Sequence, residues 1–98
     1  MELVDSKLVN QNGIQFEIKL YREVSDGEIV GYVAKSFMGA APISPPYNAS
    51  YEVAGDWYKQ NQDYLPKRMI EWAEADIRDG IYITVDPSSH TGIRYKFK

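Results

Sequence analysis

A strict alternation of apolar and polar side chains between residues 14 and 21 constrains this chain most strongly. Ile14, Phe16, Ile18 and Leu20 occupy every second position, and the positions between them carry polar or amphipathic side chains. Successive side chains of a β-strand point to opposite faces of the sheet. The pattern therefore predicts a strand with one buried face.

The dipeptide Asp26-Gly27 connects this strand to a second strand-like run over residues 28–37. Asp-Gly favours the two-residue type I′ turn of a β-hairpin, because both central residues of that turn need positive φ angles. The resulting register is expected to set Tyr21 opposite Tyr32, Leu20 opposite Val33, and Phe16 opposite Phe37. It also places Arg22 and Lys35 at the margins of the buried face, from which their long side chains would extend outward.

A further turn is expected at residues 10–13, which read Asn-Gln-Asn-Gly. A two-residue loop would direct Leu3 and Val9 to the buried face, whereas a three-residue loop would direct Val4 and Leu8 there. A one-residue slip exchanges the two faces of a strand, and each alternative buries two apolar side chains. The pattern leaves both alternatives open.

Residues 37–48 (FMGAAPISPPYN) carry no charge, although 26% of the chain is charged. Pro42, Pro45 and Pro46 exclude a regular helix or a central strand from this stretch. One interpretation is a stiff apolar connection that crosses to a helical layer and covers the end of the core. The other is a binding surface, because long loops in compact domains are often functional.

A strong helical pattern covers residues 63–79. Asp63 can cap this helix, Pro66 is tolerated in its first turn, and Gly80 ends it. Its expected buried stripe comprises Leu65, Met69, Trp72, Ala73 and Ile77.

Residues 48–61 form a weaker candidate helix with Asn48 as its N-cap. Gly55 disfavours a helix here, and Tyr51 and Val53 would also suit a strand.

Two more strands are expected near the C-terminus. Ile81, Ile83 and Val85 alternate with polar residues, and so do Ile93, Tyr95 and Phe97. Asp86-Pro87 begins a turn between the two runs. We therefore expect a single α+β domain spanning residues 1–98, in the order β-β-β-(α)-α-β-β. It would contain a small antiparallel sheet of about five strands with one or two helices packed on one face.

The available residue types argue against most enzymes and metal centres. The chain has no cysteine and a single histidine, His90, in a Ser-Ser-His-Thr-Gly segment typical of an exposed turn. A catalytic histidine needs an orienting carboxylate and a substrate or nucleophile beside it, and tight clustering in one loop seldom supplies that geometry. No glycine-rich phosphate loop is present. We expect no catalytic activity, no metal and no cofactor.

The charge and hydropathy of the chain indicate a cytoplasmic protein. The net charge is −3, and no apolar run approaches the ~20 residues that a membrane span needs. The lack of cysteine fits a reducing compartment. We expect no association with a membrane.

Aromatic residues are concentrated beside the uncharged stretch. Tyr47, Tyr51, Trp57 and Tyr58 are the candidates for protein contact, because Tyr and Trp most often anchor interfaces. They predict a small, acidic, non-catalytic protein-interaction domain: a subunit, regulator or inhibitor of a larger partner, or a dimer formed with a second copy. The competing interpretation is that these side chains pack the first helix onto the sheet.

The outer face of the sheet suggests an alternative function. The side chains expected to point away from the helices are Lys19, Tyr21, Tyr32, Tyr82, Arg94 and Lys96. Basic and aromatic side chains on a sheet can bind single-stranded nucleic acid by stacking bases in a charged groove. A polar outer face is also ordinary for an antiparallel sheet, and the acidic net charge disfavours nucleic acid as a partner.

Overall fold

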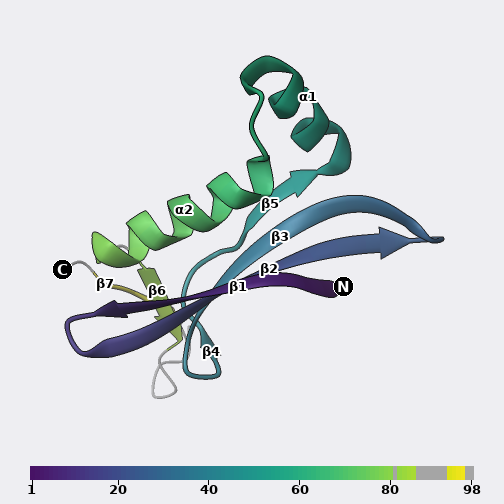
Figure 1. Cartoon of the computed structure of the whole chain (residues 1–98). Helices are drawn as coiled ribbons and strands as arrows, with labels where there is room; N and C mark the ends of the chain where they lie inside the picture. Colours follow the sequence, from purple (N-terminus) through teal and green to yellow (C-terminus); the bar gives the residue numbers. More distant parts are fainter. Residues whose placement is uncertain (81, 86–92, 97–98) are drawn as a thin grey trace.

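Three long strands that follow each other along the chain form most of the main sheet (Figure 1). The structure is a computed structural model, and its described part comprises residues 1–80 and the backbone of residues 82–85 and 93–96. The elements in chain order are β1 (Glu2–Gln11), β2 (Ile14–Ser25), β3 (Glu28–Met38), β4 (Ala41–Pro42), β5 (Tyr47–Ser50), α1 (Tyr51–Asn61), α2 (Leu65–Arg78), β6 (Tyr82–Val85) and β7 (Ile93–Lys96). The five-stranded main sheet is antiparallel, and the two helices pack on it. The expected α+β fold class is confirmed. We call the sheet face toward α2 the inner face and the opposite face the outer face.

Both long hairpins close with two-residue turns. Asn12 and Gly13 have φ angles of 52° and 78°, and Asp26 and Gly27 have φ angles of 51° and 78°. Positive φ at both central positions defines the type I′ turn, whose twist matches that of the flanking strands. The Asp26-Gly27 turn is confirmed, and the first hairpin adopts the two-residue alternative.

The first hairpin buries Val9, which is 1% exposed, but not Leu3, which is 58% exposed. The register between β1 and β2 shifts between Leu3 and Asp5, so Leu3 lies opposite Tyr21 on the outer face. A one-residue shift exchanges the faces of a strand. The inward Leu3 expected for this loop length is therefore wrong.

The pairing of β2 with β3 contains an extra residue. Glu23 lies opposite Gly31, but Val24 lies opposite Ile29, so Val30 has no partner of its own in β2. Such a β-bulge moves every following side chain of the strand to the other face. The register expected from the turn is therefore wrong by one residue beyond this point.

The expected cross-strand pairs change accordingly. Tyr21 lies opposite Val33, Leu20 opposite Ala34, Phe16 opposite Met38 and Glu17 opposite Phe37. Tyr32 turns to the inner face and is 7% exposed. Lys35 turns to the outer face, where its Nζ lies 5.5 Å from the centre of the Tyr21 ring.

The uncharged stretch runs along the second edge of β3. β4 pairs with the end of β3, and β5 pairs with its middle. Between them, Ile43 is fully buried, and its N–H donates to the carbonyl of Ser36 at 3.0 Å. Pro42 is compatible with β4 because β4 is an edge strand. The stretch thus covers part of its own core through Ile43 and then leads into β5 at the edge of the sheet.

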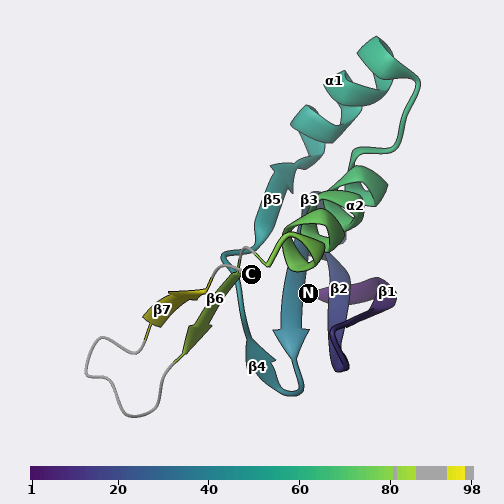
Figure 2. The ribbon, with the colours of Figure 1, turned by 90° about the vertical axis from the view of Figure 1, so that its left-hand side faces the viewer.

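α2 lies across the inner face and supplies much of the core (Figure 2). Its buried residues are Leu65, Pro66, Met69, Ile70, Ala73 and Ile77. Trp72 was expected in this stripe, but it is 40% exposed. Ile70 faces the sheet instead, and Trp72 lies on the side of the helix. The N-cap residue is Tyr64 rather than Asp63, and Gly80, with φ 71°, follows the end of the helix as expected.

α1 follows β5 directly and extends beyond the sheet (Figure 1). Its N-cap is Ser50, whose hydroxyl accepts the N–H of Val53 at 3.1 Å. Asn48 lies in β5, so its expected role as N-cap is wrong. No residue of α1 is buried, and only Ala54 and Trp57 pack partly against the core.

β6 and β7 form a separate antiparallel pair, in which Tyr82 lies opposite Lys96. Among the described strands, neither pairs with the main sheet, although β6 lies next to β4 (Figure 2). The main sheet has the expected five strands, but β4 and β5 are among them, whereas the two C-terminal strands form this separate pair. Ile81, the turn at residues 86–89, His90 and Phe97 lie outside the described residues.

Gly31 determines how closely β5 approaches β3. A methyl group at this position would lie 2.9 Å from the carbonyl oxygen of Ala49. We expect Gly31→Ala to lower the free energy of unfolding by about 1–3 kcal/mol, as overpacking of a tight site does. Urea unfolding measures this change.

Gly55→Ala is the matched control, because nothing lies within 4 Å of a methyl group at this helical position. It should raise the free energy of unfolding by about 0.5–1 kcal/mol, since alanine is the better helix former. A Gly31→Ala protein that is as stable as wild type would contradict the close contact between β3 and β5.

Candidate interaction site

An apolar groove of about 280 Å³ lies where β5, α1 and α2 meet. Its walls come from β5 (Tyr47, Asn48, Ala49), from α1 (Val53, Trp57) and from α2 (Leu65, Met69, Trp72). α2 packs mainly over β1, β2 and β3, whereas β5 lies at the edge of the sheet. The groove is the space that remains between this edge and the two helices.

Three aromatic side chains of the groove contact each other. The ring centres of Tyr47 and Trp72 are 6.1 Å apart, and those of Trp57 and Trp72 are 6.0 Å apart. The two indole rings meet at 89°, an edge-to-face geometry that aromatic pairs favour. Trp72 thus links a residue of β5 to a residue of α1 from its position on α2.

The polar ends of two of these aromatic side chains, Tyr47 and Trp57, are bonded within the chain. The hydroxyl of Tyr47 donates to Oδ2 of Asp76, and Nε1–H of Trp57 donates to Oδ2 of Asp63 at 3.0 Å. Burial and then the hydrogen bond to Asp76 raise the pKa of Tyr47 to about 12, so this hydroxyl stays a neutral donor. Since these two donors are already satisfied, the rings of Tyr47 and Trp57 offer apolar surface without leaving their own polar groups unpaired.

Asp63 links the aromatic cluster to the start of α2. It also accepts a hydrogen bond from Nε of Arg68 at 2.7 Å, and Arg68 donates to Oε2 of Glu71 at 2.9 Å. The hydrogen bonds from Trp57 and from Arg68 lower the pKa of Asp63. Trp57 is therefore held by a carboxylate that remains ionised at neutral pH.

Two of the four residues predicted for protein contact come together in the groove, namely Tyr47 and Trp57. Tyr51 and Tyr58 are 54% and 55% exposed, and neither lines the groove. Positions seven apart share one face of a helix, and this face lies about 100–120° around α1 from Trp57. The helical stripe predicts Trp72 as a core residue, so sequence reasoning misses it as a wall of the groove.

The predicted nucleic-acid surface is not assembled on one face. Tyr32 points inward, where its ring centre lies 6.0 Å from that of Tyr64, so its predicted outward position is wrong. Tyr82, Arg94 and Lys96 belong to the separate pair of β6 and β7, and their side chains lie outside the described part.

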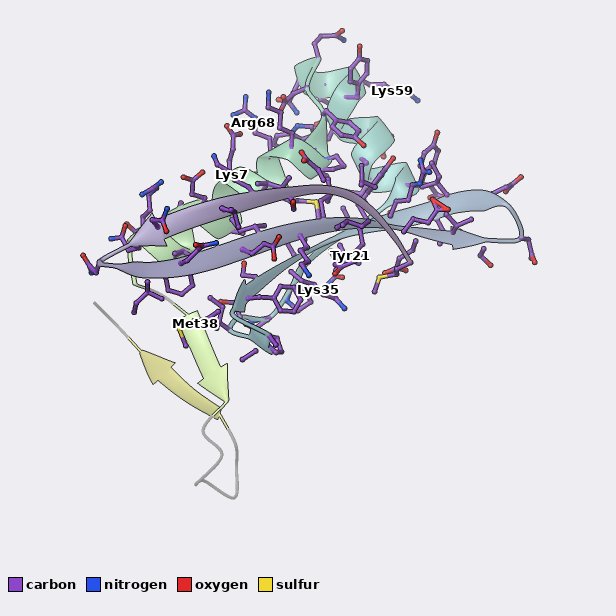
Figure 3. The ribbon with its side chains drawn as sticks, turned by 60° about the horizontal axis from the view of Figure 1, so that its bottom comes forward. Lys7, Tyr21, Lys35, Met38, Lys59 and Arg68 are labelled. Atoms are coloured by element: carbon purple, nitrogen blue, oxygen red, sulfur yellow. The ribbon has the colours of Figure 1, made fainter. Side chains whose placement is uncertain are left out.

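Lys19 and Tyr21 do lie on the outer face, on β2, and Figure 3 shows Tyr21 beside Lys35 there. The aromatic rings of this face are covered by ammonium groups. Nζ of Lys19 lies 5.2 Å from the ring centre of Phe37, and Lys35 covers Tyr21 in the same way. These cation–π contacts occupy the ring surface that a stacked base would need.

No cluster of three or more His, Asp or Glu side chains within the described residues is arranged to hold a metal ion. None of the helices in the described part has the length and apolar character to cross a membrane.

Comparison of the chain with protein-family models, with curated proteins and with solved structures found no match.

Acid is expected to release Trp57 from Asp63. Because the folded-state pKa of Asp63 is lowered, its stabilising contribution is fully present above the pKa of an unfolded aspartate, 3.8. That contribution is lost as the pH falls through the lower folded-state pKa. We expect wild type to be more stable than Asp63→Asn at neutral pH, and this difference to shrink toward zero in acid.

Urea unfolding at successive pH values, followed by tryptophan fluorescence, measures the difference. Arg68→Gln removes the second donor to Asp63 and should weaken the same pH dependence. A difference between wild type and Asp63→Asn that stays constant from neutral to acid pH would count against this assignment.

Proposed function

We propose that this chain is a non-catalytic protein-interaction domain whose binding surface is the aromatic groove between β5, α1 and α2. The observation that carries the proposal is the set of Tyr47, Trp57 and Trp72, whose rings line an open groove. The polar ends of Tyr47 and Trp57 are bonded internally. Aromatic residues in such settings are the usual energetic anchors of protein interfaces. A partner that fills the groove would gain apolar contact while the donors of Tyr47 and Trp57 keep their hydrogen bonds.

α1 exposes further apolar side chains. Val53 lines the groove, whereas Tyr51 and Tyr58 lie on another face of the helix. All three are more than half exposed, and no residue of α1 is buried. Helices of globular proteins normally bury an apolar stripe, and contiguous exposed apolar surface marks interaction sites. A partner would cover the apolar side chains that remain exposed on this helix.

The proposed role is that of a cytoplasmic subunit, regulator or inhibitor of a larger protein, or of one half of a dimer. The acidic net charge of −3 favours protein partners over nucleic acid. No observation on the outer face favours the nucleic-acid alternative, because lysines cover its rings.

Site-specific photo-cross-linking in the native host tests the proposal. A photoreactive phenylalanine analogue at Val53, inside the groove, should give a discrete set of protein adducts. The same analogue at Gln15, an exposed position outside the groove, should not give them. Adducts with a second copy of the chain would identify self-association, and sedimentation would then show a dimer.

Val53 adducts should disappear when Trp57→Ala is added, provided that circular dichroism shows the fold retained. Identical adducts from Val53 and Gln15, or adducts to oligonucleotides instead of protein, would contradict the proposal.

A further inference from the structure

We infer that the groove receives an extended segment of another chain, which pairs with the free edge of β5 and carries apolar residues alternating with lysine or arginine. This inference rests on the proposed function. It adds the backbone conformation and the side-chain chemistry of the partner.

β5 offers backbone hydrogen-bonding groups at the edge of the sheet. Among the described strands it pairs only with β3, with Tyr47 opposite Ala34 and Ser50 opposite Gly31. In an antiparallel pair, alternate residues direct N–H and C=O groups toward the partner strand, and the residues between them direct these groups away. Such outward groups are a template for a further strand.

A strand added beside β5 would send every second side chain to the inner face. On β5 itself, the inward residues are Tyr47 and Ala49, and both line the aromatic groove. The inward side chains of the added strand would therefore lie beside these residues and between the strand edge and Trp57 and Trp72. These positions select apolar side chains.

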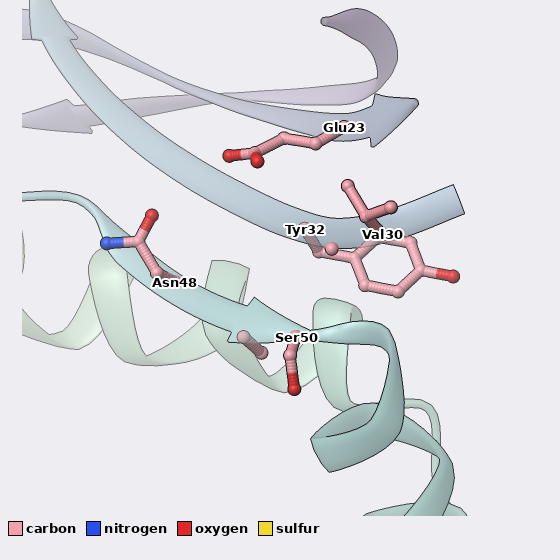
Figure 4. Close-up of a pocket in the computed structure, with 7 residues that line it drawn as sticks. Glu23, Val30, Tyr32, Asn48 and Ser50 are labelled. Atoms are coloured by element: carbon pink, nitrogen blue, oxygen red, sulfur yellow. The ribbon is translucent and has the colours of Figure 1, made fainter. Parts of the chain in front are cut away.

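The remaining side chains of the added strand would face the outer side, where a second hollow of about 370 Å³ lies. Glu23, Gly31 and Ser50 form one cross-strand row over β2, β3 and β5. Because Gly31 has no side chain, the row has a gap between Glu23 and Ser50. Figure 4 shows Glu23 on one side of β3 and Asn48 and Ser50 on the other.

The charges around β5 select a basic segment. Glu23 borders the outer hollow, Asp56 lies one helical turn from Val53, and Asp76 holds Tyr47 at the groove. None of these three carboxylates forms an ion pair with another described side chain. Arg68, the cation beside Asp63, is already paired with Asp63 and Glu71. Glu23 lies on the outer face, toward which lysine or arginine on the added strand would point, and Asp56 and Asp76 add negative charge on the groove side. A basic segment would therefore be attracted, and an acidic one would be repelled.

A panel of capped hexapeptides provides the probe. The odd positions carry Ile, Val, Tyr or Phe, and the even positions carry Lys or Arg. The chain's own residues 93–98, IRYKFK, have this pattern and form one member of the panel. Both tryptophans of the chain, Trp57 and Trp72, line the groove, so intrinsic fluorescence reports its occupancy. Amide hydrogen exchange at residues 47–50 reports strand pairing.

Alternating basic peptides should shift the tryptophan emission and slow amide exchange in β5. Peptides of the same composition with the apolar and basic residues in two separate blocks should bind at least about tenfold more weakly. They cannot place apolar side chains on the inner face and basic side chains on the outer face at the same time. Peptides with Asp or Glu at the even positions should not bind.

Protein variants separate the two faces. Trp72→Ala should weaken every peptide, whereas Glu23→Gln should weaken the basic peptides but not analogues with Thr at the even positions. Glu28→Gln, at an exposed position near the Asp26-Gly27 turn, is the control and should bind like wild type.

The proposal is overturned if no peptide of the panel changes both the fluorescence and the exchange of β5. It is also overturned if block peptides bind as well as alternating ones. If Val53 still gives specific protein adducts but no peptide binds, the interaction function stands and only the added strand is refuted. If Val53 gives no specific adducts and no peptide binds, both proposals are refuted.

Discussion

The extra residue in β3 determines how the rest of the sheet is arranged. Val30 has no partner in β2, so the residues after it turn to the faces opposite those set by the Asp26-Gly27 turn. Tyr32 consequently points inward and packs near Tyr64, while Gly31 points outward. The absence of a side chain at Gly31 lets the Ala49 carbonyl approach. β5 can therefore pair with β3, and its last residue, Ser50, caps α1.

The groove follows from this placement of β5 and from internal hydrogen bonds that hold its rings. Tyr47 is fixed by Asp76 on α2, and Trp57 is fixed by Asp63 at the junction of the helices. Trp72 lies between them in edge-to-face contact with Trp57. Side chains that are already ordered lose little conformational entropy when a partner binds. An exposed cluster of this kind is unfavourable in the isolated chain, because apolar rings remain in contact with water. It also preorganises a contact surface.

The sequence predicted the features that depend on local pattern. The alternation from Ile14 to Leu20, the Asp26-Gly27 turn and the long helix at residues 65–78 all appear in the structure, and together they determine the fold class. These signals are local because strand alternation, turn chemistry and helical periodicity need no knowledge of distant contacts.

The features that the sequence did not predict depend on contacts between distant segments. Ile29 and Val30 are both apolar, so either can follow the turn as an inward residue, and the bulge leaves no trace in the alternation. β5 has only four residues and exists because β3 presents a free edge. Trp72 fits the buried stripe by spacing, yet the rotation of α2 on the sheet puts Ile70 there instead. Of the candidate site, the sequence therefore indicated Tyr47 and Trp57 but not the residue that joins them.

The position of the Tyr32 ring tests the central claim most directly, because it reports the face on which β3 places its side chains. Nuclear Overhauser contacts between assigned tyrosine ring protons measure it in solution. The bulge at Val30 predicts contacts between Tyr32 and Tyr64 and none between Tyr32 and Tyr21. Contacts between Tyr32 and Tyr21 would show that β3 follows the unshifted register, which would remove the basis for the placement of β5 and for the groove beside it.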